Sequence, residues 1–142
     1  MTSACPLCTP VDESLIWSDQ YFRVVAVNDP RHPGFVCVIC QEHVREFSDL
    51  PTAQRLALME LVARIESLMR SALSPDKINL ASLGNQVPHL HWHIIARWSD
   101  DPCFPESIWS APKREPVESA WVVRHQQAAQ FLQTLGKALR QH

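Results

Sequence analysis

The sequence predicts an α+β fold, in which a mainly antiparallel β-sheet carries one long helix and a second helix follows at the C-terminus. Short runs rich in β-branched and aromatic residues are separated by turn residues, and two long segments carry apolar residues at helical spacing. With 142 residues, 46% hydrophobic and 20% charged, the chain has the length and composition of one globular domain, residues 1–142. A disordered chain, a coiled coil and a collagen-like repeat are thereby excluded.

A strand–loop–strand unit is predicted in the first third of the chain, after a turn-rich N-terminal arm over residues 1–14. Residues 21–27 are rich in β-branched and aromatic side chains, which favours a strand. Asn, Asp, Pro and Gly gather in residues 28–34 and indicate a loop. Residues 35–40 then return as a second strand, and so short a connection predicts an antiparallel pair.

The clearest helix is predicted over residues 51–73. Apolar residues recur there every three or four positions, so they share one face, which we expect to pack on the sheet. Pro51 marks the start of this segment and Pro75 its end. The apolar positions are Leu58, Leu61, Val62, Ile65, Leu68, Met69 and Ala72.

The second half of the chain predicts two more strands and another helix. Residues 77–83 and 88–97 have the composition of strands, and residues 84–86 form a turn between them. A Pro-rich loop over residues 99–118 follows, and loops of this length in a small domain usually carry function or move. Residues 118–140 are predicted to form an amphipathic C-terminal helix.

Charge and hydropathy limit the partners that this chain is expected to have. The formal net charge is −2 at pH 7, so the sequence shows no basic footprint for duplex nucleic acid. No apolar run reaches the roughly 18 residues of a membrane span, and residues 1–6 lack the charged start and apolar core of a signal peptide. We therefore expect a cytoplasmic protein with neither nucleic acid nor a membrane as partner.

The five cysteines form two pairs with C-x-x-C spacing and one single residue. An odd number without a secretion signal argues against a disulfide framework. Taken together, the two pairs would make a four-cysteine zinc site. However, Cys37 and Cys40 lie in a predicted strand, where side chains three apart point to opposite faces, so we expect small core residues there. Cys5 and Cys8 are flanked by turn residues and remain half of a candidate zinc site.

A row of three histidines carries most of the functional information. His89, His91 and His93 alternate with apolar residues, so in a strand they would share one face. Crowded imidazoles raise one another's cost of protonation, which makes them a poor choice for a merely polar surface. Two hypotheses follow: a zinc site made by all three rings, or a nucleophile or general acid–base whose neighbours orient it and bind anions.

This segment resembles the signature of the histidine triad (HIT) family, His-φ-His-φ-His-φ-φ with φ apolar. All seven positions agree: His89-Leu90-His91-Trp92-His93-Ile94-Ile95. Asn79 and the turn over residues 84–87 precede it, where HIT proteins carry a polar strand and a Gly-containing phosphate loop. Residues 100–109 resemble the tail of a bacterial branch described as diadenosine tetraphosphate hydrolase-like. The resemblance implies a HIT-like fold with an antiparallel sheet of about five strands.

The resemblance also implies an enzyme that acts at the α-phosphate of a nucleotide or dinucleoside polyphosphate, as a hydrolase or transferase. The middle histidine, His91, would be the nucleophile and would form a covalent nucleotidyl-imidazole. A backbone carbonyl near His89 would hold the other nitrogen of its ring, and His93 would contact the phosphate. His89, His91 and His93 are thus the expected catalytic residues.

Residues around the triad would hold the nucleotide, together with His93. Asn28 would bind the ribose hydroxyls, Asn85 and Gln86 would donate to non-bridging oxygens, and Gly84 would allow a close backbone approach. Asn79 is the remaining residue of this expected nucleotide site. Gln86 departs from the family pattern, because several HIT branches have Ser or Thr there, whose hydroxyl helps to protonate the leaving group. This departure favours a polyphosphate leaving group over an amine.

The resemblance further implies a structural zinc and a homodimer. Some bacterial HIT proteins hold zinc with an N-terminal C-x-x-C, a histidine after the second strand and the first triad histidine. The matching residues here are Cys5, Cys8, His43 and His89, and catalysis would need no metal. HIT proteins are commonly homodimers, so we expect one here. Two other functions stay open: a nucleotide-binding or sensing module with little turnover, and a nucleoside phosphoramidase.

Two tryptophans and three further histidines complete the candidates. Trp98 and Trp109 flank the Pro-rich loop, so either one is a candidate to cover the site. His32, His125 and His142 are expected to be solvated.

Overall fold

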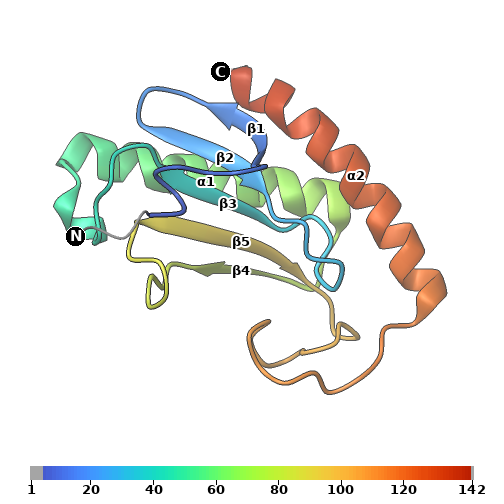
Figure 1. Ribbon diagram of the computed structural model, residues 1–142. Helices are drawn as coiled ribbons and strands as arrows, with labels where there is room; N and C mark the ends of the chain where they lie inside the picture. Colours follow the sequence, from blue (N-terminus) through green and yellow to red (C-terminus); the bar gives the residue numbers. More distant parts are fainter. Residues whose placement is uncertain (1–4, 142) are drawn as a thin grey trace.

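A five-stranded antiparallel sheet with two long helices forms the protein (Figure 1). The computed structural model describes residues 5–141, so His142 lies outside the described residues. Across the sheet the strand order is β1-β2-β3-β5-β4. The α+β class and the antiparallel pairing predicted from the sequence are therefore confirmed. The strands are β1 (Ser14–Ser18), β2 (Phe22–Ala26), β3 (Val36–Cys40), β4 (Lys77–Ala81) and β5 (His91–Arg97).

Strands β2, β3 and β4 lie within the expected ranges and are one or two residues shorter, whereas β1 and β5 differ more from the sequence-based expectation. The edge strand β1 was not expected, because its register shifts between Leu15 and Trp17 and the shift interrupts the two-residue alternation. Strand β5 was expected from residue 88 but begins at His91, and His89 lies in the bend before it. The prediction that three imidazoles share one strand face is therefore wrong for His89.

The helices cover one face of the sheet and one of its edges. Helix α1 (Thr52–Leu73) follows a short 3-10 helix, η1 (Phe47–Asp49), and packs on the sheet as its apolar stripe predicts. Helix α2 (Glu118–Arg140) lies along α1 and β1 (Figure 1). A Cβ on Gly136 would lie 2.6 Å from the Ile16 carbonyl oxygen, so α2 approaches β1 closely only because this residue is glycine. No helix within residues 5–141 combines the length and apolarity needed to cross a membrane.

The opposite face of the sheet is covered by loops and carries a smaller apolar cluster. Its buried members are Val25, Phe35, Cys37, Ile39, Ile95 and Ile108. Cys40 belongs to the main core beneath α1, so Cys37 and Cys40 point to opposite faces and are buried, as predicted. His32, expected to be solvated, is only 1% exposed, and neither of its ring nitrogens has a hydrogen-bond partner. Burial lowers the pKa of His32, so its ring is buried in the neutral form.

Candidate functional site

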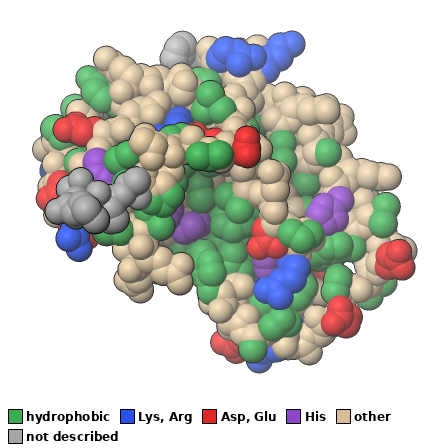
Figure 2. Space-filling view, viewed as in Figure 1, with side chains coloured by type: hydrophobic (Ala, Val, Ile, Leu, Met, Phe, Trp, Pro, Cys, Tyr) green, Lys and Arg blue, Asp and Glu red, His purple; other side chains and the backbone are tan. Residues whose placement is uncertain are grey.

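Two of the three triad histidines line a cavity on the face opposite α1. His91 and His93 stand two residues apart on β5, and their ring centroids are 4.9 Å apart. The cavity measures about 320 Å³ and is bordered by the turn that precedes β5 and by the loop that follows it. Figure 2 shows histidine and hydrophobic side chains gathered in a hollow on this face. The lining residues are Leu83, Gly84, Asn85, Gln86, Val87, His91, His93 and Trp109.

The ring of His91 is held by a hydrogen bond to the backbone. Its Nδ1 lies 2.6 Å from the carbonyl oxygen of His89, the contact that the family resemblance implied. A carbonyl oxygen only accepts, so Nδ1 carries the proton and donates it. The other nitrogen, Nε2, therefore keeps its lone pair, which is the form that a nucleophilic imidazole requires.

The ring of His93 is fixed from several sides. Its Nδ1 lies 3.3 Å from the Sγ atom of Cys37, and the rings of Phe35 and Trp109 stand 5.6 and 5.0 Å from its centroid. Burial, and then the neighbouring His91, lower the pKa of His93 to about 4. His93 is consequently neutral near pH 7 and carries one ring proton.

The turn before β5 supplies backbone and side-chain groups to the same cavity. Gly84 has φ +83°, a left-handed conformation that glycine adopts without strain. Asn85 and Gln86 follow with exposed side chains that line the cavity. The Ser82 hydroxyl donates to the His91 carbonyl oxygen at 2.8 Å and ties this turn to the strand. The structure thus brings together residues 84–86 with both cavity histidines.

The two other expected nucleotide-binding residues lie outside this cavity. Asn28 is exposed, donates through Nδ2 to the Ser14 hydroxyl at 3.3 Å, and borders a separate hollow beside α2. Asn79 accepts a hydrogen bond at 2.8 Å from Arg97 and so belongs to a different network. Their assignment to the nucleotide stays a prediction.

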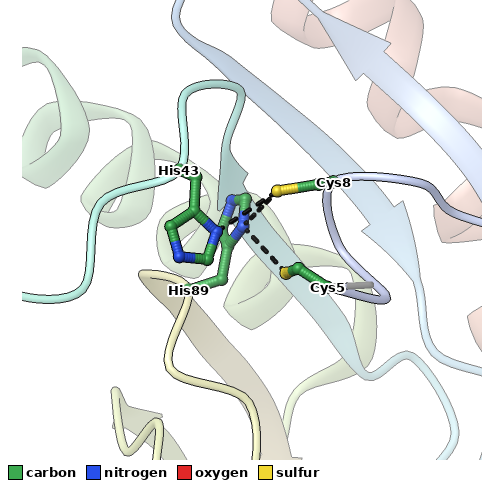
Figure 3. Close-up of side chains that lie close together, drawn as sticks. All are labelled: Cys5, Cys8, His43 and His89. Atoms are coloured by element: carbon green, nitrogen blue, oxygen red, sulfur yellow. Dashed lines mark hydrogen bonds between the residues drawn. The ribbon is translucent and has the colours of Figure 1, made fainter. Parts of the chain in front are cut away.

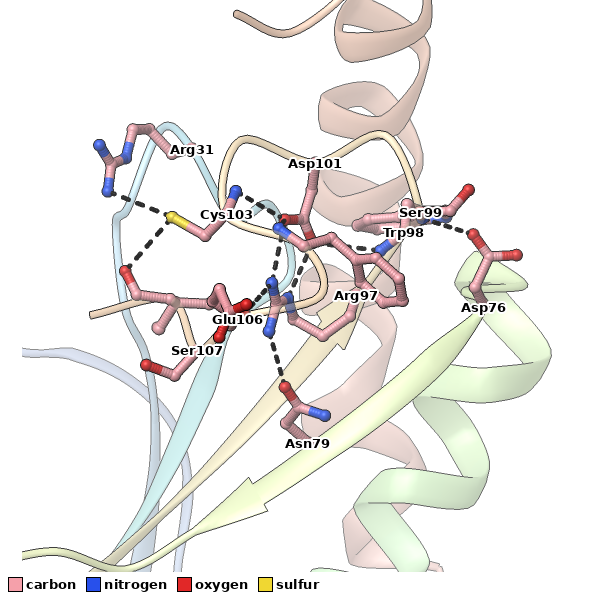
Figure 4. Close-up of polar contacts among 12 residues, drawn as sticks. Arg31, Asp76, Asn79, Arg97, Trp98, Ser99, Asp101, Cys103, Glu106 and Ser107 are labelled. Carbon is pink, nitrogen blue, oxygen red and sulfur yellow. Dashed lines mark hydrogen bonds and ion pairs between the residues drawn. The ribbon is translucent and has the colours of Figure 1, made fainter. Parts of the chain in front are cut away.

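A buried ion pair orders the Pro-rich loop over residues 99–117. Arg97 and Asp101 are joined by two hydrogen bonds, of 2.8 and 3.0 Å, and are 1% and 0% exposed (Figure 4). Although burial alone would raise the pKa of Asp101, Arg97 and the backbone N–H groups of Phe104 and Cys103 lower it below its usual value. This loop carries Trp109 to the cavity, half exposed, whereas Trp98 is buried in the main core.

Sequence reasoning missed the Arg97–Asp101 pair and the contact of Cys37 with His93. A charged residue at the end of a buried strand, followed four positions later by an acid, is a usable signal for such a pair. The contact of Cys37 depends on the register between β3 and β5, which the sequence does not reveal.

A second cluster, of two cysteines and two histidines, lies at the start of the triad segment (Figure 3). One ligand atom from each of Cys5, Cys8, His43 and His89 lies within 4.8 Å of all the others. A backbone turn brings the sulfurs together, because the N–H of Cys8 donates to the Cys5 carbonyl at 3.1 Å. Two sulfurs and two imidazole nitrogens are a ligand set that zinc favours in structural sites, so these residues fit a zinc ion.

His89 is oriented toward the sulfurs and away from the cavity. It is fully buried, its Nε2 donates to the Cys40 carbonyl at 2.7 Å, and its Nδ1 lies 3.4 and 3.5 Å from the Sγ atoms of Cys5 and Cys8. Since Nε2 carries the ring proton and donates it in a hydrogen bond to the carbonyl, Nδ1 keeps a lone pair directed at the sulfurs. Burial lowers the pKa of His89, which keeps this ring neutral.

The chain is similar in sequence to known proteins over its central part. Residues 9–100 match the model of the HIT domain family. An uncharacterised HIT-like protein of Saccharolobus solfataricus is 33% identical over 87 residues, which are 56% of this chain and 63% of that protein. An AP-4-A phosphorylase of Mycobacterium tuberculosis is 26% identical over 53% of this chain and 42% of its own length. A bis(5'-nucleosyl)-tetraphosphatase (asymmetrical) of Schizosaccharomyces pombe is 27% identical over 65% and 53%. The match therefore spans between 42% and 63% of the length of these relatives.

Solved structures resemble the chain over most of its length. A histidine triad protein of Marinobacter aquaeolei is 29% identical, with a TM-score of 0.67 over 87% of this chain and 91% of its own. Another, from Bradyrhizobium japonicum, is 26% identical, with a TM-score of 0.68 over 85% and 91%.

Proposed function

The chain belongs to the HIT domain family, and we propose that it hydrolyses nucleotides or dinucleoside polyphosphates at the α-phosphate through a covalent intermediate on His91. The observation that carries the proposal is the hydrogen bond from His91 Nδ1 to the His89 carbonyl, which leaves Nε2 bare in a cavity of about 320 Å³. Two relatives support this substrate class, since they are named for AP-4-A phosphorolysis and for bis-nucleosyl tetraphosphate hydrolysis.

The reaction proceeds in two displacements at phosphorus. In the first, the Nε2 lone pair of His91 attacks the α-phosphorus, a P–N bond forms, and the P–O bond to the polyphosphate leaving group breaks. In the second, water attacks the same phosphorus and releases a proton to the solvent, and the P–N bond breaks with its electron pair returning to Nε2. The His89 carbonyl stabilises the positive charge that the ring of His91 carries in the intermediate.

The residues around His91 supply donors for the charged oxygens. Asn85 and Gln86 donate to non-bridging oxygens, and Gly84 allows the chain to pass close to the phosphate. His93 stands beside His91, where it donates to the phosphate or to the bridging oxygen. An uncharged amide at Gln86 cannot protonate a leaving group, which favours polyphosphates, since these leave without a proton.

A zinc ion held by Cys5, Cys8, His43 and His89 is part of the proposal. It would supply no chemistry at the phosphate, since its four ligands close the coordination sphere. Its role would be to fix the N-terminal arm and His89, whose carbonyl orients the nucleophile.

Hydrolysis of diadenosine tetraphosphate in ¹⁸O-labelled water tests the proposal. Attack at the α-phosphorus, followed by hydrolysis of the intermediate, places the label in adenosine monophosphate. Label in adenosine triphosphate would contradict attack at the α-phosphorus. Tight binding without product, across diadenosine polyphosphates, nucleoside phosphoramidates and adenylylated sulfate, would favour the nucleotide-binding module instead.

A further inference from the structure

Cys37 lies directly beside one of the two cavity histidines. In the antiparallel pairing of β3 with β5, Cys37 stands opposite His93, so both side chains leave the same face of the sheet. Its Sγ lies 3.3 Å from the Nδ1 atom of His93, and no other described residue hydrogen-bonds that nitrogen. The cysteine is buried among Phe35, Ile39 and Ile95, which shelters the contact from solvent.

The protons on the two partners can be counted. Burial raises the pKa of the Cys37 thiol to about 12, so the sulfur keeps its hydrogen at neutral pH. His93 is neutral at the same pH and carries one hydrogen on one of its two nitrogens. The contact therefore involves either S–H donating to a bare Nδ1, or Nδ1–H donating to sulfur.

The first arrangement uses the stronger acceptor. A neutral imidazole nitrogen accepts hydrogen bonds well, whereas a thiol sulfur accepts them weakly. If S–H donates to Nδ1, the ring proton lies on Nε2, which has no protein partner within residues 5–141 and belongs to a ring that lines the cavity. An N–H there can donate a hydrogen bond to a phosphate oxygen, whereas a bare nitrogen would repel that oxygen.

We infer that Cys37 is a positioning residue, whose thiol holds His93 in the tautomer with Nε2–H directed at the substrate. The two neighbouring imidazoles then present different nitrogens to the phosphate. The backbone carbonyl leaves His91 Nε2 bare, and the thiol leaves His93 Nε2 protonated. The tautomer is argued from the contact and from the acceptor strength of the two atoms, whereas its use in catalysis rests on the proposed function.

Nitrogen NMR of the ring nitrogens tests the inference without any turnover. Long-range ¹H–¹⁵N correlations near pH 7 distinguish protonated from bare nitrogens, and the signals of His93 are assigned by comparison with His93→Gln. The expected spectrum shows Nε2 protonated and Nδ1 bare but hydrogen-bonded. A spectrum of the unaltered protein with Nδ1 protonated would overturn the inference.

A matched pair of substitutions tests whether the thiol proton sets the tautomer. Cys37→Ser keeps a donor, whereas Cys37→Val keeps an apolar side chain of similar size without one. We expect the single tautomer to persist with Ser and to become a mixture with Val, together with a rise in the pKa of His93, because the lost hydrogen bond had favoured the neutral ring. An unchanged tautomer and pKa in Cys37→Val would contradict the inference.

Kinetic measurements then distinguish a role of Cys37 in positioning His93 from a role in packing alone. If the chain hydrolyses dinucleoside polyphosphates, Cys37→Val should lower kcat on the order of tenfold with little change in KM, and Cys37→Ser should restore most of it. Equal loss in both variants would contradict a role for the donor. The predicted tautomer in a chain without turnover would refute the proposed function and leave the proton assignment intact.

Discussion

The triad segment has two ends with different surroundings: His89 at its start, beside the cysteines, and His91 with His93 after it, at the cavity. At its start, His89 is fully buried, donates from Nε2 to a carbonyl and directs Nδ1 at two sulfurs. Two residues later, His91 donates from Nδ1 to a carbonyl and leaves Nε2 bare beside an open cavity. A backbone carbonyl selects the tautomer in both rings, and the nitrogen that it holds decides which nitrogen is free to react. The proposed metal binding and the proposed nucleophilic attack are thereby assigned to two rings within three residues.

Replacing the proposed nucleophile should give the largest effect, and it distinguishes the cavity end of the segment from the cysteine end. We expect His91→Ala to lower turnover of diadenosine tetraphosphate by at least about a thousandfold, because no other group can form the intermediate. Its zinc content should stay unchanged. Chromatography of products and metal analysis measure both quantities, with His125→Ala as the histidine control outside the cavity. Loss of zinc together with activity would show that the two ends form one metal site.

Breaking the cluster of Cys5, Cys8, His43 and His89 should change zinc binding and stability at the start of the triad segment. Cys5→Ser is expected to abolish zinc binding and to lower Tm by roughly 10–15 °C, since structural zinc contributes directly to folding. Elemental analysis and thermal unfolding check this, and a chelator should reproduce the loss of Tm in the unaltered protein. Cys103→Ser, far from the cluster, is the matched control. A Cys5→Ser variant with full zinc content would contradict zinc binding by this cluster.

The cavity, unlike the cluster, depends on the loop that carries Trp109. Asp101→Asn leaves the buried Arg97 without its charged partner, which should lower the free energy of unfolding by about 3 kcal/mol. Lys113→Ala breaks an exposed pair with Glu106 and should cost less than about 1 kcal/mol. Urea unfolding compares the two variants, and equal losses would contradict the importance of burial.

This pair also predicts a pH dependence. The pKa of Asp101 is lower in the folded chain than in the unfolded chain, so the unfolded chain binds the proton more readily at acid pH. Its contribution is complete above the ordinary aspartate pKa of about 3.9 and is lost as pH falls below it. Unfolding measured from pH 7 to pH 3 should therefore show a smaller loss in Asp101→Asn than in the unaltered chain. An identical loss would exclude Asp101 as a contributor.

The smallest effect concerns the leaving group at the cavity end. Gln86→Ser introduces a hydroxyl that can deliver a proton, so the rate on a nucleoside phosphoramidate relative to diadenosine tetraphosphate should rise on the order of tenfold. Gln86→Ala removes the amide without adding a hydroxyl and is the control. The same ratio in both variants would show that residue 86 does not select the leaving group.

The fold could be predicted from the sequence more completely than the different positions of the three triad histidines. Helical spacing located α1 and α2 to within a residue at each end, because long amphipathic patterns are unambiguous. Strand β1 was not predicted, because a five-residue edge strand with a register shift carries no clear alternation of apolar and polar residues. The cluster of Cys5, Cys8, His43 and His89 was expected from family resemblance, and the structure brings these four residues together.

Register and loop geometry limited the remaining predictions about the site. His89 was expected to share a face with the other two rings, but the chain bends before β5 and turns it toward the sulfurs. Asn79 was expected at the nucleotide, yet its side chain is bound to Arg97, a partner that only the tertiary structure reveals. The pairing of Cys37 with His93 depends on the register of two strands far apart in sequence.

Capture of the covalent intermediate tests the central claim most directly. Protein quenched during turnover of diadenosine tetraphosphate, under alkaline conditions that preserve a P–N bond, is digested and analysed by tandem mass spectrometry. We predict one adenylyl group on the peptide that contains the triad, with fragment ions assigning it to His91. An adenylyl group on His89 or His93, or rapid product formation with no adduct on any histidine, would contradict the account.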